Sequence, residues 1–206
     1  MTRCYLVRHA QTAWNDVNRI QGQSDTPLSP LGRRQAERLG VRFASHHVSG
    51  IFTSALQRSR QTAEAIAAGN GHGASPVVEP GLAEMHLGAW EGLTPAEVDA
   101  RFQNVYQQWR RQPSSVVIPG GEPLEAFRAR VRTTLAKILA GVGDGEYVVV
   151  SHGGVIAAWL ADALISFLDW PAFVLAAFAS FWCGWWALCR HWKGMKPLDG
   201  QTLAIR

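Results

Sequence analysis

Short apolar runs alternate along this chain with longer segments in which apolar residues recur every three or four positions. The short runs, each followed by polar or turn-forming residues, predict strands at Cys4–Val7, Gly50–Thr53, Pro76–Glu79 and Tyr147–Val150. The longer segments predict helices from Ser29 to about His46, from Ser54 to about Ala68, over residues 95–111, over residues 124–138 and from Gly154 to about Ile165. The polar stretch 10–28 is expected to form a long functional loop.

Three of the helix starts carry local signals. Ser29 precedes a proline, so its hydroxyl is expected to cap a helix that has proline at its first position. Thr94 and Glu97 form a capping box, and Ser54 with Gln57 resembles another.

Strands that alternate with helices of this length are typical of βα units. The pattern therefore predicts an α/β fold, a three-layer sandwich whose central sheet is mainly parallel and flanked by helices. A length of 206 residues suits one domain, and no repeat or linker divides the chain, so residues 1–206 are expected to form a single domain.

The composition is that of a globular protein, with 47% hydrophobic and 17% charged residues. A net charge of +4 favours anionic ligands such as phosphates, and the lack of a dense Lys/Arg run argues against nucleic-acid binding. The three cysteines, Cys4, Cys183 and Cys189, suggest neither a disulfide framework nor a zinc motif and fit a reducing compartment. Because the N-terminus has no apolar signal region, a cytoplasmic protein is expected.

Candidate chemistry begins where the first predicted strand ends, at Arg8 and His9. A histidine there can attack phosphorus while the guanidinium holds phosphate oxygens. Taken alone, the pair is more often a surface feature of a strand end, because His and Arg are common at loop edges. Arg58 lies one turn before Thr62 near a predicted helix start, where it could bind phosphate or belong, with Arg60, to a solvated basic face.

Two further segments offer a carboxylate and a second histidine. Glu84 lies in a glycine-containing loop, where a desolvated carboxyl could give a proton to a leaving oxygen, or could simply pair at the surface. His152 follows another strand and precedes Gly153 and Gly154, which permit close backbone approach. A satisfied structural histidine is the alternative interpretation there.

Together these segments resemble the histidine phosphatase (phosphoglycerate mutase-like) superfamily. The resemblance covers residues 3 to about 160 and rests on four motifs in order: 8–15 (RHAQTAWN), 54–62 (SALQRSRQT), 82–92 (LAEMHLGAWEG) and 151–154 (SHGG). Residues 119–122, followed by Arg128 and Arg132, also resemble a family segment.

The resemblance implies a role for each matching residue. His9 would be the nucleophile that becomes phosphohistidine, and Glu84 would protonate the leaving oxygen and then activate the acceptor. Arg8, Arg58 and His152 would neutralise the phosphoryl oxygens. Asn15 would contact the phosphate, with Thr12 and Gln21 as supporting contacts. No metal ion or cofactor is implied, because cationic side chains supply the charge.

One residue departs from the family pattern. Ala10 follows the nucleophile where glycine is usual. If the backbone needed a positive φ there, alanine would strain it by about 1 kcal/mol or more.

The motifs are shared by two reactions that differ in what discharges the phosphohistidine. Glycolytic mutases of this superfamily carry an extra basic insertion, whereas only a short segment separates Glu91 from Gly120 in this chain. A metal-independent phosphatase acting on a small phosphorylated metabolite is therefore favoured, with a 2,3-bisphosphoglycerate-dependent mutase as the alternative. Candidate substrates include sugar phosphates, phosphoglycerate derivatives and α-ribazole 5′-phosphate.

The aromatic-rich segment 166–206 is atypical for the superfamily. Trp170–Cys189 is a run of twenty residues without a charge, which by length could span a bilayer. The family fold instead implies strands at Ala179–Cys189 and Thr202–Ile205, and a membrane span would leave the domain without them. The apolar surplus could also cover a homodimer interface or line a pocket.

Overall fold

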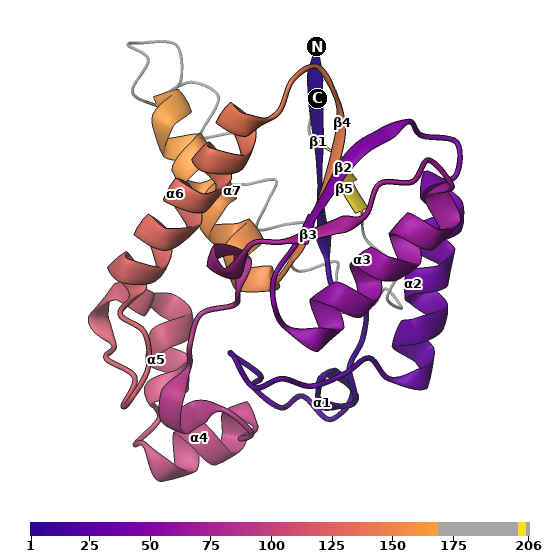
Figure 1. Cartoon of the computed structure of the whole chain (residues 1–206). Coiled ribbons are helices and arrows are strands. Elements are labelled where there is room, and N and C mark those ends of the chain that lie inside the picture. The colour runs from indigo at the N-terminus through magenta and orange to yellow at the C-terminus, as the bar shows by residue number, and fades with distance from the viewer. Residues whose placement is uncertain (169–201, 205–206) are drawn as a thin grey trace, which may run out of the picture.

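The computed structural model describes residues 1–168 and 202–204 and contains one five-stranded sheet (Figure 1). The strand order is β3-β2-β4-β1-β5. The strands are β1 (Thr2–Arg8), β2 (Val48–Thr53), β3 (Pro76–Val78), β4 (Gly145–Ser151) and β5 (Thr202–Ala204). The first four run parallel, and β5 pairs antiparallel with β1. The predicted, mainly parallel sheet is therefore confirmed.

The register of β1 on β4 determines where their polar ends lie. Thr2 pairs with Gly145 at one end of the ladder, and Arg8 pairs with Ser151 at the other. Because carboxyl ends of parallel strands meet at one edge of the sheet, the residues that follow these two strands lie side by side.

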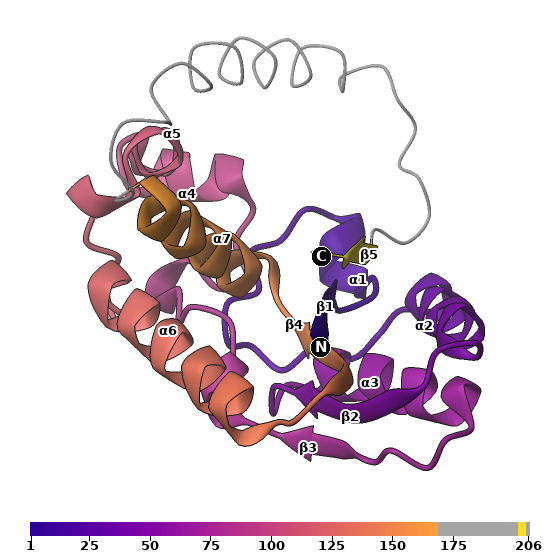
Figure 2. The same ribbon diagram turned by 90° about the horizontal axis from the view of Figure 1, so that it is seen from above.

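Two pairs of helices cover the two faces of the sheet (Figure 2). One face carries α2 (Pro30–Phe43) and α3 (Gln57–Asn70), and the other carries α6 (Leu124–Gly141) and α7 (Gly153–Leu168). This arrangement confirms the predicted three-layer sandwich.

Alternate residues of the central strands supply two separate hydrophobic clusters. Leu6 and Val149 join the cluster that contains the apolar face of α6, whereas Tyr5, Val7 and Val148 join the cluster that contains α2 and α3. Both faces of β1 and β4 are thus buried, which explains their continuously apolar sequence.

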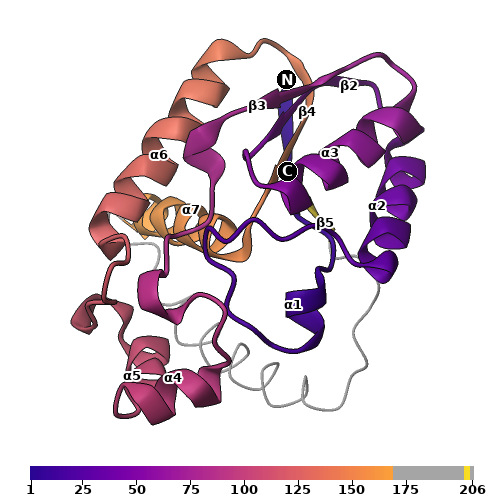
Figure 3. The same ribbon diagram turned by 60° about the horizontal axis from the view of Figure 1, so that its bottom comes forward.

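Shorter elements lie near the carboxyl end of the sheet (Figure 3). They are α1 (Ala13–Asp16), α4 (Pro95–Arg101) and α5 (Val105–Arg111), with the 3-10 turns η1 (Pro80–Leu82), η2 (Gly88–Trp90) and η3 (Pro113–Ser115). The helix α1 interrupts the stretch 10–28 that was expected to be a loop, because Thr12 and Asn15 form a capping box.

The single helix expected over residues 95–111 is wrong, because the chain breaks it into α4 and α5. Gln103 and Asn104 at the break have positive φ values of 55° and 62°. The Asp99 carboxylate accepts hydrogen bonds from the backbone N–H groups of Tyr106, at 2.8 Å, and Gln107, at 3.4 Å. A side chain that satisfies the start of a second helix competes with continuation of the first.

The predicted helix cap at Ser54 is also wrong, whereas the caps predicted at Ser29 and Thr94 are confirmed. Ser29 accepts a hydrogen bond from the Gly32 N–H, and Thr94 forms its capping box with Glu97. Helix α3 instead begins at Gln57 and has no side-chain cap.

At the far end of the chain, the strand expected at Thr202–Ile205 is present as β5, Thr202–Ala204. The run Trp170–Cys189 and the strand expected at Ala179–Cys189 lie outside the described residues. Over the described part of the chain, every helix is too short or too polar to cross a bilayer.

Candidate active site

The parallel ladder of β1 and β4 brings two histidines together. The backbone N–H of His9 donates to the Ser151 carbonyl at 2.9 Å, which continues the pairing by one residue. The rings of His9 and His152 lie with their centroids 5.1 Å apart. Two residues separated by most of the chain therefore share one site at the carboxyl edge of the sheet.

His9 is held in one tautomer. Its Nδ1 lies 2.8 Å from the Ala10 carbonyl oxygen, which can only accept, so Nδ1 carries the proton and Nε2 keeps its lone pair. The side chain is buried, and burial together with the charges of Arg58 and Arg8 lowers the pKa of His9 to about 3. The ring is therefore neutral and nucleophilic at physiological pH.

Ala10 fits its position without backbone strain. Its φ is not positive, as positive values occur elsewhere at Asn18, Gln103 and Asn104 among the described non-glycine residues. The Ala10 N–H donates to the Thr62 hydroxyl at 3.1 Å. This hydrogen bond links the backbone next to His9 to α3.

Arg58 lies in the first turn of α3 and is only 1% exposed. Its Nη1 donates to the Ser24 carbonyl at 2.8 Å, and its Nη2 donates to the Gly22 carbonyl at 2.7 Å. Carbonyl groups fix the guanidinium without neutralising its charge. Arg8, by contrast, is exposed at the end of β1. Both arginines line one cavity, which is described below.

His152 is fully buried directly after β4. Its Nε2 lies 2.7 Å from the Ser54 hydroxyl, so the serine that fails to cap α3 instead holds this ring. The Nδ1 atom has no hydrogen-bond partner among the described residues. Burial, then the proximity of His9 and of arginines, lowers the pKa of His152 well below its usual value.

Glu84 reaches the site from the loop after η1. Its carboxylate accepts hydrogen bonds from the backbone N–H groups of Met85, at 2.9 Å, and Gly154, at 3.0 Å. A Cβ on Gly154 would lie 2.3 Å from the carboxylate Oε1, so only glycine allows this approach to the start of α7. Burial raises the pKa of the Glu84 carboxyl, despite these two hydrogen bonds and the charge of Arg58.

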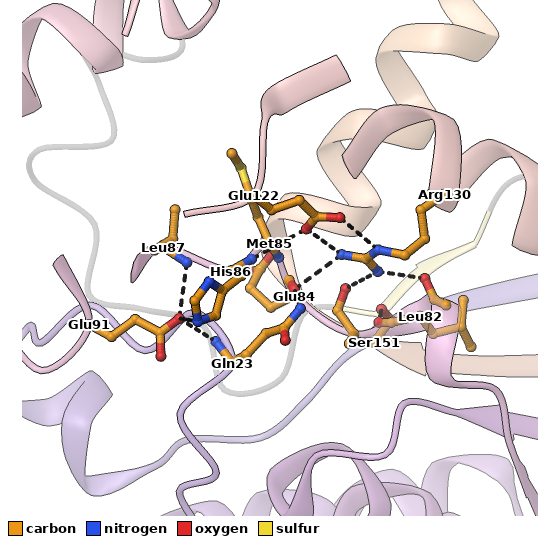
Figure 4. A network of polar contacts seen from close by, with 12 residues as sticks. Gln23, Leu82, Glu84, Met85, His86, Leu87, Glu91, Glu122, Arg130 and Ser151 are labelled. Atoms are coloured by element: carbon orange, nitrogen blue, oxygen red, sulfur yellow. Dashed lines mark hydrogen bonds and ion pairs between the residues drawn. The ribbon is translucent and has the colours of Figure 1, made fainter. Parts of the chain in front are cut away.

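A second glutamate organises the neighbouring loops (Figure 4). Glu91 accepts hydrogen bonds from the backbone N–H groups of Leu87, at 3.0 Å, and Gln23, at 2.9 Å. The Gln23 side chain in turn donates to the Glu84 carbonyl at 3.0 Å. The loop after β1 and the loop that carries Glu84 are thereby joined.

These residues surround a cavity of about 450 Å³. Six of the eight predicted site residues line it, namely Arg8, His9, Asn15, Gln21, Arg58 and Glu84. Thr12 does not line the cavity, because it is fully buried and its hydroxyl bonds to Asn15 and Gln21 at 3.0 Å and 2.9 Å. His152 is fully buried and is not among the residues that line this cavity.

The outer wall of the cavity is aromatic and basic. Tyr106, Trp109 and Arg110 of α5 line it, as does Arg19. Arg19 lies 3.5 Å from the Glu97 carboxylate, whereas Arg110 makes no ion pair or hydrogen bond within residues 1–168 and 202–204.

In chemical terms the site combines a neutral histidine with a lone pair on Nε2, two guanidinium groups and a partly desolvated carboxyl group around one cavity. This set can accept a phosphoryl group, hold its oxygens and supply a proton. In the part of the chain that the structure describes, no three His, Cys, Asp or Glu side chains are placed to hold a metal ion.

The fold and the site together are suited to phosphoryl transfer. The sequence model of the histidine phosphatase superfamily (branch 1) matches residues 4–181, and the chain belongs to this superfamily.

Named relatives include both mutases and phosphatases. "Probable phosphoglycerate mutase GpmB" of Yersinia enterocolitica is 35% identical over 173 residues, which cover 80% of this chain and 75% of that protein. A mycobacterial glucosyl-3-phosphoglycerate phosphatase of known structure is 36% identical, with a TM-score of 0.69 and 78% of each chain covered. A complex of this phosphatase with inorganic phosphate has a TM-score of 0.68 at 34% identity, covering 78% of this chain and 77% of that one.

Three residues with evident roles in the site escaped sequence analysis. Ser54 was interpreted as a helix cap, and Glu91 was identified only as part of a motif, without a role. The family resemblance directed attention to Arg128 and Arg132 of α6, yet Arg130 between them contacts the Glu84 loop. No local signal marks this role of Arg130, because the loop carbonyls that it contacts lie more than forty residues away.

Proposed function

We propose that this protein is a phosphomonoesterase that transfers the phosphoryl group of a small metabolite to His9 and then to water. The observation that carries the proposal is the tautomer of His9. Its Nδ1 is bound to the Ala10 carbonyl, so Nε2 presents a lone pair beside Arg8 and Arg58. A general surface role would not require a buried, neutral histidine between two guanidinium groups.

In the first step, Nε2 of His9 attacks phosphorus and the P–O ester bond breaks. The leaving oxygen keeps the bonding electrons and takes the proton of the Glu84 carboxyl. Burial raises the pKa of that carboxyl, which favours the protonated form that this step requires. Arg8 and Arg58 stabilise the charge on the transferred oxygens.

In the second step, the Glu84 carboxylate takes a proton from water as that water attacks phosphorus. The P–N bond breaks, its electrons return to Nε2, and phosphate leaves. Glu84 is again protonated and His9 again neutral, so the cycle closes.

His152 acts in this scheme as a hydrogen-bond donor rather than as a cation. The Ser54 hydroxyl accepts from the Leu56 N–H at 3.4 Å, so its own proton can be donated to Nε2 of His152. The ring proton then resides on Nδ1, the nitrogen without a partner among the described residues. This donor is available to an oxygen of the phosphoryl group on His9.

Catalysis without a metal ion follows from the same charges. Arg58 is fixed by two carbonyls and Arg8 lies at the cavity wall, so positive charge is in place before the substrate arrives. In enzymes that use Mg²⁺, the ion supplies this neutralisation.

Two findings favour hydrolysis over mutase transfer. The short segment between Glu91 and Gly120 folds into α4, α5 and η3, and residues of the first two line the cavity. No longer insertion is present there to grip a bisphosphate. The similarity to a phosphatase of known structure agrees with this choice, whereas the similarity to GpmB keeps the mutase as the alternative.

The test is steady-state hydrolysis of a panel of phosphorylated metabolites by wild type and His9→Ala, with EDTA present. We expect turnover in EDTA that the substitution abolishes, and acid-labile phosphate that rapid quenching traps on the wild type only. Labelling that persists in His9→Ala would overturn the assignment. Activity that appears only with added 2,3-bisphosphoglycerate and a phosphoglycerate acceptor would establish the mutase.

A further inference from the structure

Glu84 stands in a stretch of irregular backbone between η1 and η2. Neither a helix nor a strand fixes its main chain, yet a general acid must be placed to within a fraction of an ångström of the leaving oxygen. Other contacts must therefore hold this loop in place.

The Arg130 guanidinium, reaching over from α6, supplies many of these contacts (Figure 4). Its Nη1 donates to the carbonyls of Gly81 and Ala83, both at 2.8 Å. Its Nη2 lies 3.4 Å from the Glu84 carbonyl. The three carbonyls belong to the residues that lead into Glu84, so one planar group fixes that side of the loop.

Glu122 connects Arg130 to the part of the loop that follows Glu84. The Nε and Nη2 atoms of Arg130 donate to its two carboxylate oxygens at 2.9 Å and 2.7 Å, a bidentate pair. The Glu122 N–H donates to the His86 carbonyl at 2.8 Å, and its carboxylate lies 3.4 Å from the His86 N–H. The Arg130–Glu122 pair thus contacts the loop both before and after Glu84.

We propose that Arg130 is a positioning residue for Glu84, setting the place of the general acid without touching the substrate. The inference rests on the proposed function, because it assigns Arg130 to the proton-donating half of that chemistry. Only a planar guanidinium can bond two carbonyls and a carboxylate at once; a lysine ammonium lacks this geometry.

Neighbouring arginines on α6 provide matched controls. Arg128 pairs with Asp162 of α7 at 2.5 Å, and Arg132 lies 3.7 Å from the same carboxylate. Neither donates a hydrogen bond to the loop of Glu84 within the described residues. Arg132→Met therefore removes a similar charge from the same helix without disturbing the general acid.

The leaving group of the substrate separates positioning from mere stability. An alkyl phosphate releases a strongly basic oxygen and needs the proton of Glu84, whereas 2,4-dinitrophenyl phosphate releases a stable phenolate that needs none. A variant with a displaced acid should therefore lose kcat/KM, which reports the steps up to loss of the leaving group, only on the alkyl ester. A variant with a damaged or partly unfolded site should lose activity on both.

We would measure kcat/KM, which covers the steps up to loss of the leaving group and excludes the later attack of water that Glu84 also assists. The substrates are glycerol phosphate and 2,4-dinitrophenyl phosphate, and the proteins are wild type, Glu84→Gln, Arg130→Met, Arg130→Lys and Arg132→Met. Arg130→Met is expected to lose about 10²-fold on the alkyl ester and to stay near wild type on the aryl ester. Glu84→Gln should show the same selectivity, Arg130→Lys should recover little, and Arg132→Met should match the wild type on both.

An equal loss on both esters in Arg130→Met, or no loss on either, would overturn the positioning role. Failure of the proposed function has a different signature: Glu84→Gln would then show no selectivity, or His9→Ala would keep its activity. If Arg130→Met does not fold, Glu122→Gln serves instead, because it weakens the bidentate pair while leaving Arg130 on the carbonyls. It should show the same selectivity with a smaller loss, and equal losses there would likewise reject the proposal.

Discussion

At the scale of single residues, the environment of His9 determines its chemistry and also makes the fold sensitive to acid. The folded protein keeps this ring neutral, because burial and two arginines lower its pKa to about 3 from an ordinary 6.5. In the unfolded chain the ring is solvated and takes up a proton near its ordinary pKa. Protons therefore bind preferentially to the unfolded state between these two values.

The sign of the resulting pH dependence follows directly. The contribution of His9 to the unfolding free energy is fully present above about pH 6.5. It is lost as the pH falls toward 3, at ~1.4 kcal/mol per pH unit. We expect His9→Ala to show a shallower decline of unfolding free energy over this range, measured by urea denaturation. The exposed His47 is the control, since His47→Ala should retain the wild-type slope. Parallel curves for wild type and His9→Ala would contradict the prediction.

The residues that sequence analysis found share one property. His9 and His152 follow buried strands, and Arg58 lies in the first turn of a helix after a strand, so local pattern and fold class together place them at one edge. Ser54 and Arg130 were missed because their roles depend on partners 98 and 46 to 49 residues away. Such contacts are set by tertiary packing, which no local pattern of one sequence records.

At the scale of elements, helices were predicted well where their signals are local and poorly where a side chain acts at a distance along the chain. Ser29 caps α2 as expected, but Asp99 bonds ahead to Tyr106 and so ends one helix and starts another. The close crossing of α2 and α3 is a further feature that the pattern could not give. It depends on Gly40 and Gly69, whose backbones touch.

A methyl group at this crossing should separate the two helices. A Cβ on Gly69 would lie 2.4 Å from the Gly40 backbone, whereas a Cβ on Gly141, at the end of α6, would meet nothing within 4 Å. Gly69→Ala is expected to destabilise the protein by roughly 1–3 kcal/mol through overpacking. Gly141→Ala should be neutral or slightly stabilising, because alanine favours helix. Thermal or urea unfolding checks both, and equal midpoints would show that the helices move apart without cost.

At the scale of the whole molecule, one cavity extends from His9 to α5. Arg8 and Arg58 match the two charges of a phosphate ester, and Arg19 is paired with Glu97. Arg110 lines the outer wall with no ion pair among the described residues. A substrate with an acidic group beyond its phosphate would therefore be held at both ends.

This charge balance predicts selectivity that Arg110 controls. Arg110→Ala should lower kcat/KM for 3-phosphoglycerate about fivefold, equivalent to ~1 kcal/mol for a partly exposed ion pair. The same substitution should leave glycerol 3-phosphate, which lacks the carboxylate, unaffected. Arg111 faces a different surface pocket, so Arg111→Ala should change neither substrate. Equal losses on both esters would remove Arg110 from substrate recognition.

The pairing of β1 with both β4 and β5 has a consequence for how the protein is made. The strand that precedes His9 is synthesised before both of its neighbours, Gly145–Ser151 and Thr202–Ala204. Throughout most of translation β1 is an unpaired, apolar segment, and pairings of such long sequence separation form slowly. The nascent chain thus exposes one edge of this apolar strand until Thr202–Ala204 has been synthesised, and such an open edge is a site at which strands of other chains can pair.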